Sequence, residues 1–99
     1  MRSEVWIGTV EIRFSDPKTT DLMKPAFTVV TTWADHSETF RQKCSRLLES
    51  YGWKLLGVER ANPAPEDGVF SEEVEDMLSR TRTNPNAIIY GTFYSYPVM

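Results

Sequence analysis

The sequence predicts an α+β fold, a two-layer sandwich in which a four-stranded mixed sheet carries two helices on one face. Four segments have the apolar pattern of strands, and two others have apolar residues at helical spacing. These segments follow one another in the order ββαβαβ, and two amphipathic helices can bury their apolar sides against one sheet face. A chain of 99 residues is the usual size of one domain, so we expect residues 1–99 to form a single unit.

The first two strands are indicated by residues 5–14 and 26–34. In the first, apolar residues alternate with polar ones, and the second is rich in β-branched and aromatic residues. Val5 and Ile7 fall on the otherwise polar side, which indicates that the start of that side is also covered. Residues 15–25 lack periodicity and predict a loop. The two sides of the first strand carry Trp6, Val10, Ile12 and Phe14, and Thr9, Glu11 and Arg13.

The first helix is predicted by an apolar stripe that ends before a glycine suited to a helix C-terminus, Gly52. Asp35 and Glu38 have the spacing of a capping box, and Ser37 is an alternative N-cap. The stripe consists of Phe40, Cys44, Leu47, Leu48 and Tyr51.

The second half of the chain predicts a buried strand at residues 53–60, a proline-rich loop, a second helix capped by Ser71, and a final strand at residues 87–96. A helical connection from the second strand most simply leads to a parallel third strand, which gives the mixed sheet. The layers are similar to those of ferredoxin-like domains, but the order of elements departs from theirs. No motif matches a named family.

Composition excludes several classes of function. A net charge of −3 and a pI near 5.1 argue against nucleic acid as a partner. No apolar run is long enough to span a membrane, and the first residues lack the pattern of a signal peptide, so we expect a cytoplasmic protein. One cysteine and one histidine make a disulfide framework or a zinc site implausible, and no cofactor is expected.

Catalytic candidates are weak, and the sequence leans against an enzyme. His36 is the chain's one histidine, a residue type suited to general base catalysis, and Glu11 and Glu59 are carboxylates on strands. An enzyme or small-ligand-binding protein would use one of these as a base, in a cleft between loops 15–25 and 61–70. Cys44 falls within the apolar stripe of the first helix, so we interpret it as a core residue.

The leading hypothesis is a non-catalytic interaction module that forms a homodimer through an aromatic sheet face or an edge strand. Alternation along the last strand places Tyr90, Tyr94 and Tyr96 on one side and Phe93 on the other. Exposed aromatic rows on a sheet are typical of interfaces, although the rings also pack inward in many monomers.

An acidic segment supports an alternative, a small inhibitor or antidote that binds an unidentified basic protein. These acids also suit the positive end of the second helix's dipole, and their spacing is not that of a calcium-binding loop. The segment contains Glu66, Asp67, Glu72, Glu73, Glu75 and Asp76.

Overall fold

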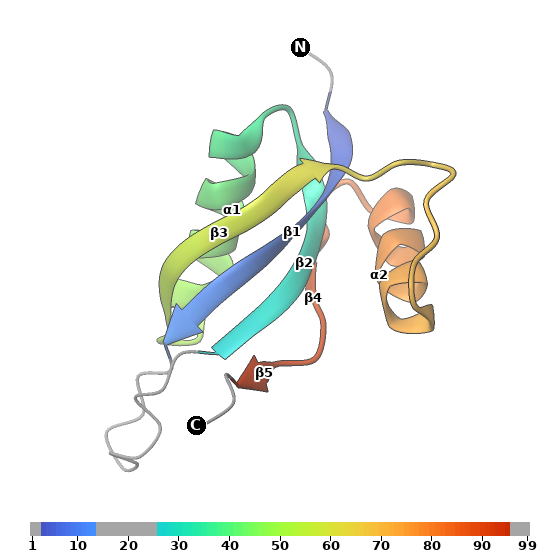
Figure 1. The fold of residues 1–99 in the computed structure, drawn as a ribbon. Coiled ribbons are helices and arrows are strands. Elements are labelled where there is room, and N and C mark those ends of the chain that lie inside the picture. The colour runs from blue at the N-terminus through green and yellow to red at the C-terminus, as the bar shows by residue number, and fades with distance from the viewer. Residues whose placement is uncertain (1–2, 14–25, 96–99) are drawn as a thin grey trace.

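The computed structural model describes residues 3–13 and 26–95 and has an α+β fold with the predicted order ββαβαβ. A short fifth strand follows the fourth (Figure 1). The elements are β1 (Glu4–Arg13), β2 (Ala26–Ala34), α1 (Ser37–Ser50), β3 (Lys54–Pro63), α2 (Glu72–Thr83), β4 (Ile88–Tyr90) and β5 (Tyr94–Ser95).

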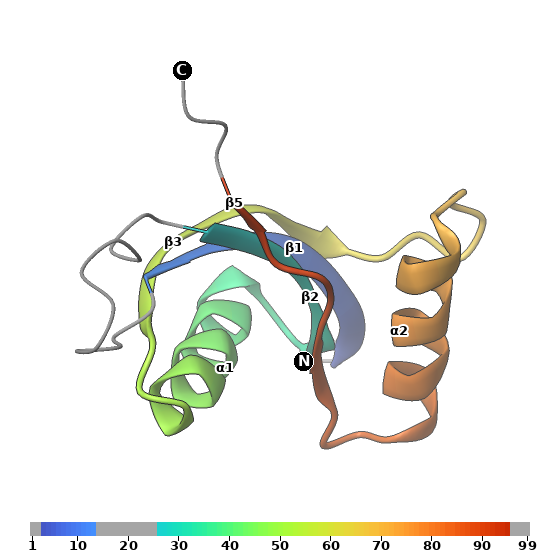
Figure 2. The same cartoon turned by 90° about the horizontal axis from the view of Figure 1, so that it is seen from below.

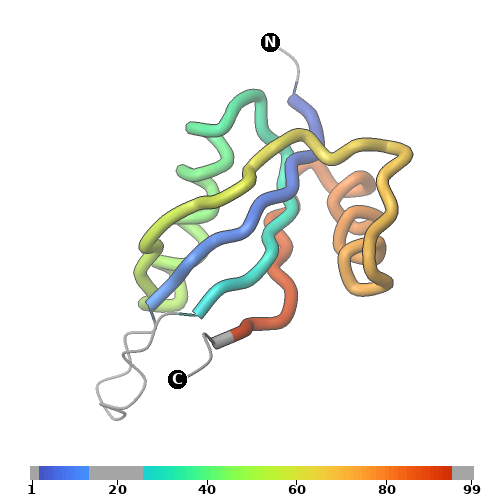
Figure 3. The backbone as a smooth tube through the Cα atoms, in the orientation of Figure 1, coloured from blue at the N-terminus to red at the C-terminus, as the bar shows by residue number. Residues whose placement is uncertain are grey.

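The sheet has the order β3-β1-β2-β4, and β5 also pairs with β2 (Figure 3). Every pair of neighbouring strands is antiparallel, so the prediction of a mixed sheet is wrong. The connection through α1 does join two strands that run in the same direction, β2 and β3. However, β1 lies between them, because the chain passes over β1 before it adds β3 to the sheet.

The two helices lie on opposite faces of the sheet, which corrects the prediction that both cover one face. Figure 2 shows the sheet curving over α1, with α2 on the outer side of the curve. The outer face binds α2 through Thr31 and Trp33, whose β1 partners are Ile7 and Val5. Apolar residues therefore need a cover on both faces at this end of the sheet, as the positions of Val5 and Ile7 in the sequence indicated.

The main core lies between α1 and the concave face. Phe40, Cys44 and Leu48 on α1 are fully buried against strand residues that all face the same way. A Cβ atom on Gly8 would come within 2.8 Å of the Phe40 ring, so this position has room only for glycine. The buried strand residues are Trp6, Val10, Ile12, Ala26, Val30 and Ala34.

The contact between α2 and the outer face is more polar. The hydroxyls of Thr31 and Thr81 are 2.8 Å apart, and the Trp33 indole N–H donates to the Thr81 carbonyl at 2.6 Å. Met77 and Leu78 supply the apolar part of this contact. Hydrogen bonds thus satisfy the polar groups that α2 buries, as a stable buried contact requires.

The helix ends differ in how well they were predicted. His36 is the N-cap of α1, where its Nδ1 accepts from the Thr39 backbone N–H at 3.3 Å, so both predicted caps are wrong. Ser71 caps α2 as predicted, and Gly52 has the left-handed φ of +78° expected after a helix. A histidine ring is an uncommon cap, since serine, threonine, aspartate and asparagine are preferred.

Candidate functional site

The last strand is broken between β4 and β5, and the break reverses the direction of its side chains. Tyr90 pairs with Val30, whereas Tyr94 pairs with Phe27, so four steps along this segment match three along β2. The extra residue places Tyr94 on the outer face, while Tyr90 stays on the concave side. The prediction that these two tyrosines share one side is therefore wrong, and Tyr96 lies outside the described residues.

Several hydrogen bonds hold this break in place. The Gly91 N–H donates to the Val29 carbonyl at 2.9 Å, and the Thr28 hydroxyl donates to the Thr92 carbonyl at 3.0 Å. From α2, Glu73 Oε1 accepts from the Thr92 backbone N–H at 2.5 Å and from its hydroxyl at 2.9 Å. Hydrogen bonds from both α2 and β2 thus fix the conformation of the chain at this break.

Aromatic rings lie on both sides of the β4–β5 edge. On the concave side, Tyr51, Trp53, Tyr90 and Phe93 form a cluster with ring centroids 4.9–6.3 Å apart. On the outer face, Phe27 and Tyr94 stack at 5.5 Å. Tyr51 and Tyr94 are each about half exposed. We call this set the aromatic edge: Phe27, Tyr51, Trp53, Tyr90, Phe93 and Tyr94.

Two tyrosines of the concave cluster, Tyr51 and Tyr90, interact in a way that affects the ionisation of Tyr90. A hydrogen bond to Tyr51 is the main cause that raises the pKa of Tyr90 above its ordinary value, with a smaller contribution from desolvation. The concave cluster therefore combines ring contacts with a hydroxyl pair at its rim.

The opposite edge of the sheet, β3, has a different character. In the described part of the chain, β3 pairs only with β1, so its other backbone edge has no strand beside it. Its pairing with β1 shifts register at two places, and it carries Lys54, Glu59, Arg60 and Pro63. Bulges, charges and proline are the features that keep an edge strand from pairing with another chain.

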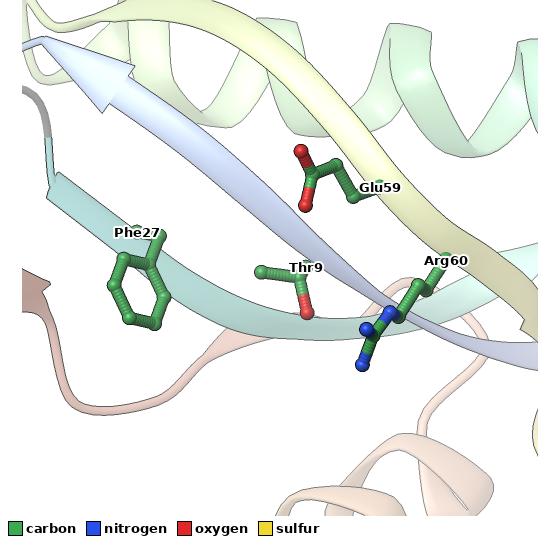
Figure 4. A pocket seen from close by; sticks show the side chains of 4 residues that line it. All are labelled: Thr9, Phe27, Glu59 and Arg60. Carbon is green, nitrogen blue, oxygen red and sulfur yellow. The ribbon is translucent and has the colours of Figure 1, made fainter.

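The outer face also has a hollow of about 260 Å³, lined by Thr9, Phe27, Glu59 and Arg60 (Figure 4). Glu11 lies on the same face, opposite Phe27 on one side and Gly57 on the other. Two of the three weak catalytic candidates, Glu11 and Glu59, thus share a surface.

The third weak candidate, His36, is not part of that surface, because it caps α1 on the other side of the sheet. Its neighbour Asp35 accepts a hydrogen bond from the Thr39 hydroxyl, which is the main cause that lowers the pKa of Asp35. Loop 15–25 lies outside the described residues, so the cleft between it and residues 61–70 stays a prediction.

Cys44 is buried in the main core, and burial raises the pKa of its thiol to about 12. The thiolate is the nucleophilic form of cysteine, so this side chain is inert at neutral pH. Its interpretation as a core residue agrees with this environment.

All six residues of the acidic segment are exposed, and two of them also make contacts within the protein. Glu73 holds the break before β5, and Asp76 forms an ion pair with Arg80 at 3.0 Å. In the described residues, no three histidine, cysteine or acidic side chains come together as a metal site would require. The remaining acids, Glu66, Asp67, Glu72 and Glu75, are exposed.

Four of the residues at these sites were not identified as site residues from the sequence. Tyr51 was assigned to a helical stripe and Phe27 to an alternating strand, with no signal that either would lie beside the last strand. Thr9 and Arg60 were not considered, because the bulge that brings Arg60 into the hollow has no signature such as a glycine at that position.

Comparisons with known proteins leave the site to be judged on its geometry. No protein-family model matches the sequence, and no curated protein or solved structure shows a significant match to it. Within the described residues, neither α1 nor α2 has the length and apolar character that a membrane crossing requires.

Proposed function

We propose that the protein is a non-catalytic interaction module that associates with a second copy of itself through the aromatic edge. The observation that carries the proposal is the position of the rings, because half of the chain's aromatic residues flank the short strands β4 and β5. Tyrosine and tryptophan are enriched at protein interfaces, where a ring contributes apolar area and its polar atom a hydrogen bond.

The two outermost tyrosines support contact with another molecule. Tyr51 and Tyr94 are about 50% exposed, although each ring already lies against another aromatic residue. Such rings are held in place before binding, so little side-chain entropy is lost when a partner covers them. A second copy is favoured as the occupant because the edge presents rings on both sides, and rings of one copy can pack between those of the other.

The other edge of the sheet is a poorer candidate. Pairing of β3 with a second β3 would bring two strands with bulges together, and the charged side chains of Lys54, Glu59 and Arg60 would lie at the contact. This contrast supports the aromatic edge over the β3 edge as the proposed interface.

The experiment is sedimentation equilibrium of the wild type and of Tyr94→Ser over a range of protein concentrations. We expect a wild-type dimer whose dissociation constant rises at least about tenfold in the variant, which corresponds to about 1.4 kcal/mol. Phe70→Ser is the matched control, because Phe70 is a partly exposed aromatic residue that does not belong to the aromatic edge. A wild type that stays monomeric at high micromolar concentration contradicts the proposal.

A basic protein partner is the second candidate, favoured by the four exposed acids Glu66, Asp67, Glu72 and Glu75. Opposite charges on two surfaces raise the rate of association, and salt lowers it. The partner is sought by capture on the immobilised protein, and its association rate is then measured at low and high salt. Equal rates at both would exclude this candidate.

A further inference from the structure

A bulge in β3 turns two neighbouring charged side chains toward the same hollow. Ile7 pairs with Asn62 and Thr9 pairs with Glu59, so Gly8 faces two residues of β3 in place of one. In a regular strand, Glu59 and Arg60 would point to opposite faces. With the bulge, both line the hollow on the outer face (Figure 4).

The backbone at this bulge is strained at Arg60. Its φ of +55° lies in the left-handed region, which glycine adopts easily and arginine rarely does. Gly8 makes the arrangement possible, because a Cβ atom there would lie 3.1 Å from the Ala61 Cα atom. Strained residues of this kind tend to occur at binding sites, so the position of Arg60 deserves a functional explanation.

Within the described residues, the charged groups of the hollow have no ion pair or side-chain hydrogen bond to satisfy them. Glu59 and Arg60 form no ion pair with each other, and neither side chain makes a hydrogen bond in the part of the chain that the structure describes. In Figure 4 the Thr9 side chain lies between them, and the Phe27 ring forms the far side of the hollow. A carboxylate, a hydroxyl, a guanidinium and an aromatic ring thus surround one space of about 260 Å³.

We propose that this hollow binds an α-amino acid with an apolar side chain. The Arg60 guanidinium pairs with the ligand's carboxylate, which is the group that arginine recognises best. The Glu59 carboxylate accepts hydrogen bonds from the ligand's ammonium group. The apolar side chain of the ligand packs on the Phe27 ring. The volume is slightly below the about 300–1,000 Å³ of drug-sized pockets, which fits a ligand of this size. The inference goes beyond self-association and concerns a second site, which shares Phe27 with the aromatic edge.

The test is titration of the protein with L-leucine, followed by NMR chemical shifts of the Thr9 and Arg60 backbone amides. We expect saturable shifts with a dissociation constant in about the millimolar range, as an open site and a small ligand imply. Isoamylamine, which lacks the carboxylate, and 4-methylpentanoate, which lacks the ammonium group, should each bind at least about tenfold more weakly.

Arg60→Gly separates loss of binding from loss of folding. Glycine relieves the strain at a positive φ, so the variant should unfold at the same or a higher temperature while its affinity for L-leucine falls at least about tenfold. Glu59→Gln should also weaken binding, and the control Arg46→Gln, on the exposed side of α1, should not.

Three outcomes would overturn the inference. They are shifts that do not saturate with L-leucine, an affinity for isoamylamine or 4-methylpentanoate equal to that for L-leucine, and unchanged affinity in a folded Arg60→Gly protein. Because each is read on the binding of L-leucine, none of them is a test of whether the protein forms a dimer.

Discussion

The two edges of the sheet differ in length, regularity and chemistry. β3 is ten residues long, has two bulges and carries charged side chains, whereas β4 and β5 are three and two residues long and lie among aromatic rings. The long edge is protected against pairing with another chain by its own irregularity. The short edge offers little backbone for pairing, so a partner there must be bound mainly by side chains.

The comparison also shows that a bulge has a different effect at each edge. In β3 it gathers Glu59 and Arg60 on one face, and between β4 and β5 it sends Tyr94 to the face opposite Tyr90. Each irregularity changes which side chains share a surface, and therefore what that surface can bind.

The largest effect is expected from Gly8→Ala, which tests the support of the β3 bulge. The new Cβ atom would meet the buried Phe40 ring at 2.8 Å and the Ala61 Cα atom at 3.1 Å, which is closer than ordinary van der Waals contact. We expect the free energy of unfolding, measured with urea, to fall by about 3 kcal/mol. Gly57→Ala is the control, because nothing lies within 4 Å of a Cβ atom there. Equal losses in the two variants would show that Gly8 has no special role.

A smaller effect is expected from Glu73→Ala, which removes the two hydrogen bonds from α2 to Thr92. We expect a loss of about 1–2 kcal/mol in the free energy of unfolding, and a weaker nuclear Overhauser effect between the Phe27 and Tyr94 rings. Glu75→Ala is the control, because it removes the same charge from the first turn of α2. Its loss of stability measures the part that comes from the helix dipole alone. If both variants keep the ring contact unchanged, Glu73 does not hold the break.

The smallest effect is expected from Tyr51→Phe, seen in the ultraviolet titration of the tyrosines. The hydrogen bond with Tyr51 raises the pKa of Tyr90, so its loss should move that titration to lower pH, toward 10.0. Because the pKa of Tyr90 is higher in the folded state than in the unfolded state, protonated Tyr90 stabilises the fold. This stabilisation is complete at pH values below the unfolded-state pKa and is lost as pH rises through the folded-state pKa. The variant should therefore lose part of its stability at neutral pH, and an unchanged titration would contradict the bond.

Local patterns in the sequence predicted the elements well. The stripe from Phe40 to Tyr51, the cap at Ser71 and the order ββαβαβ follow from side-chain periodicity and short-range hydrogen bonding. The structure confirms the cap, the order and the stripe as far as Leu48, whereas Tyr51 is the half-exposed C-cap of α1. Patterns of this kind depend on residues close together in the chain.

The arrangement of the elements was predicted less well, because it depends on contacts between distant residues. The position of β1 between β2 and β3 and the placement of α2 on the outer face leave only faint traces, such as Val5 and Ile7 on a polar side. For the site, Tyr90, Phe93 and Tyr94 were found because aromatic residues are frequent in the last strand. Strict alternation then placed Tyr94 on the wrong face, since one extra residue reverses every side chain after it.

The most direct test of the central claim is a comparison of the two edges in the same assay. Sedimentation equilibrium of the wild type, of Tyr94→Ser and of the β3 variant Lys54→Ser measures how each edge contributes to self-association. We predict a wild-type dimer that Tyr94→Ser dissociates and Lys54→Ser leaves intact. A monomeric wild type, or a dimer that Lys54→Ser weakens as much as Tyr94→Ser does, would contradict the assignment of the aromatic edge as the interface.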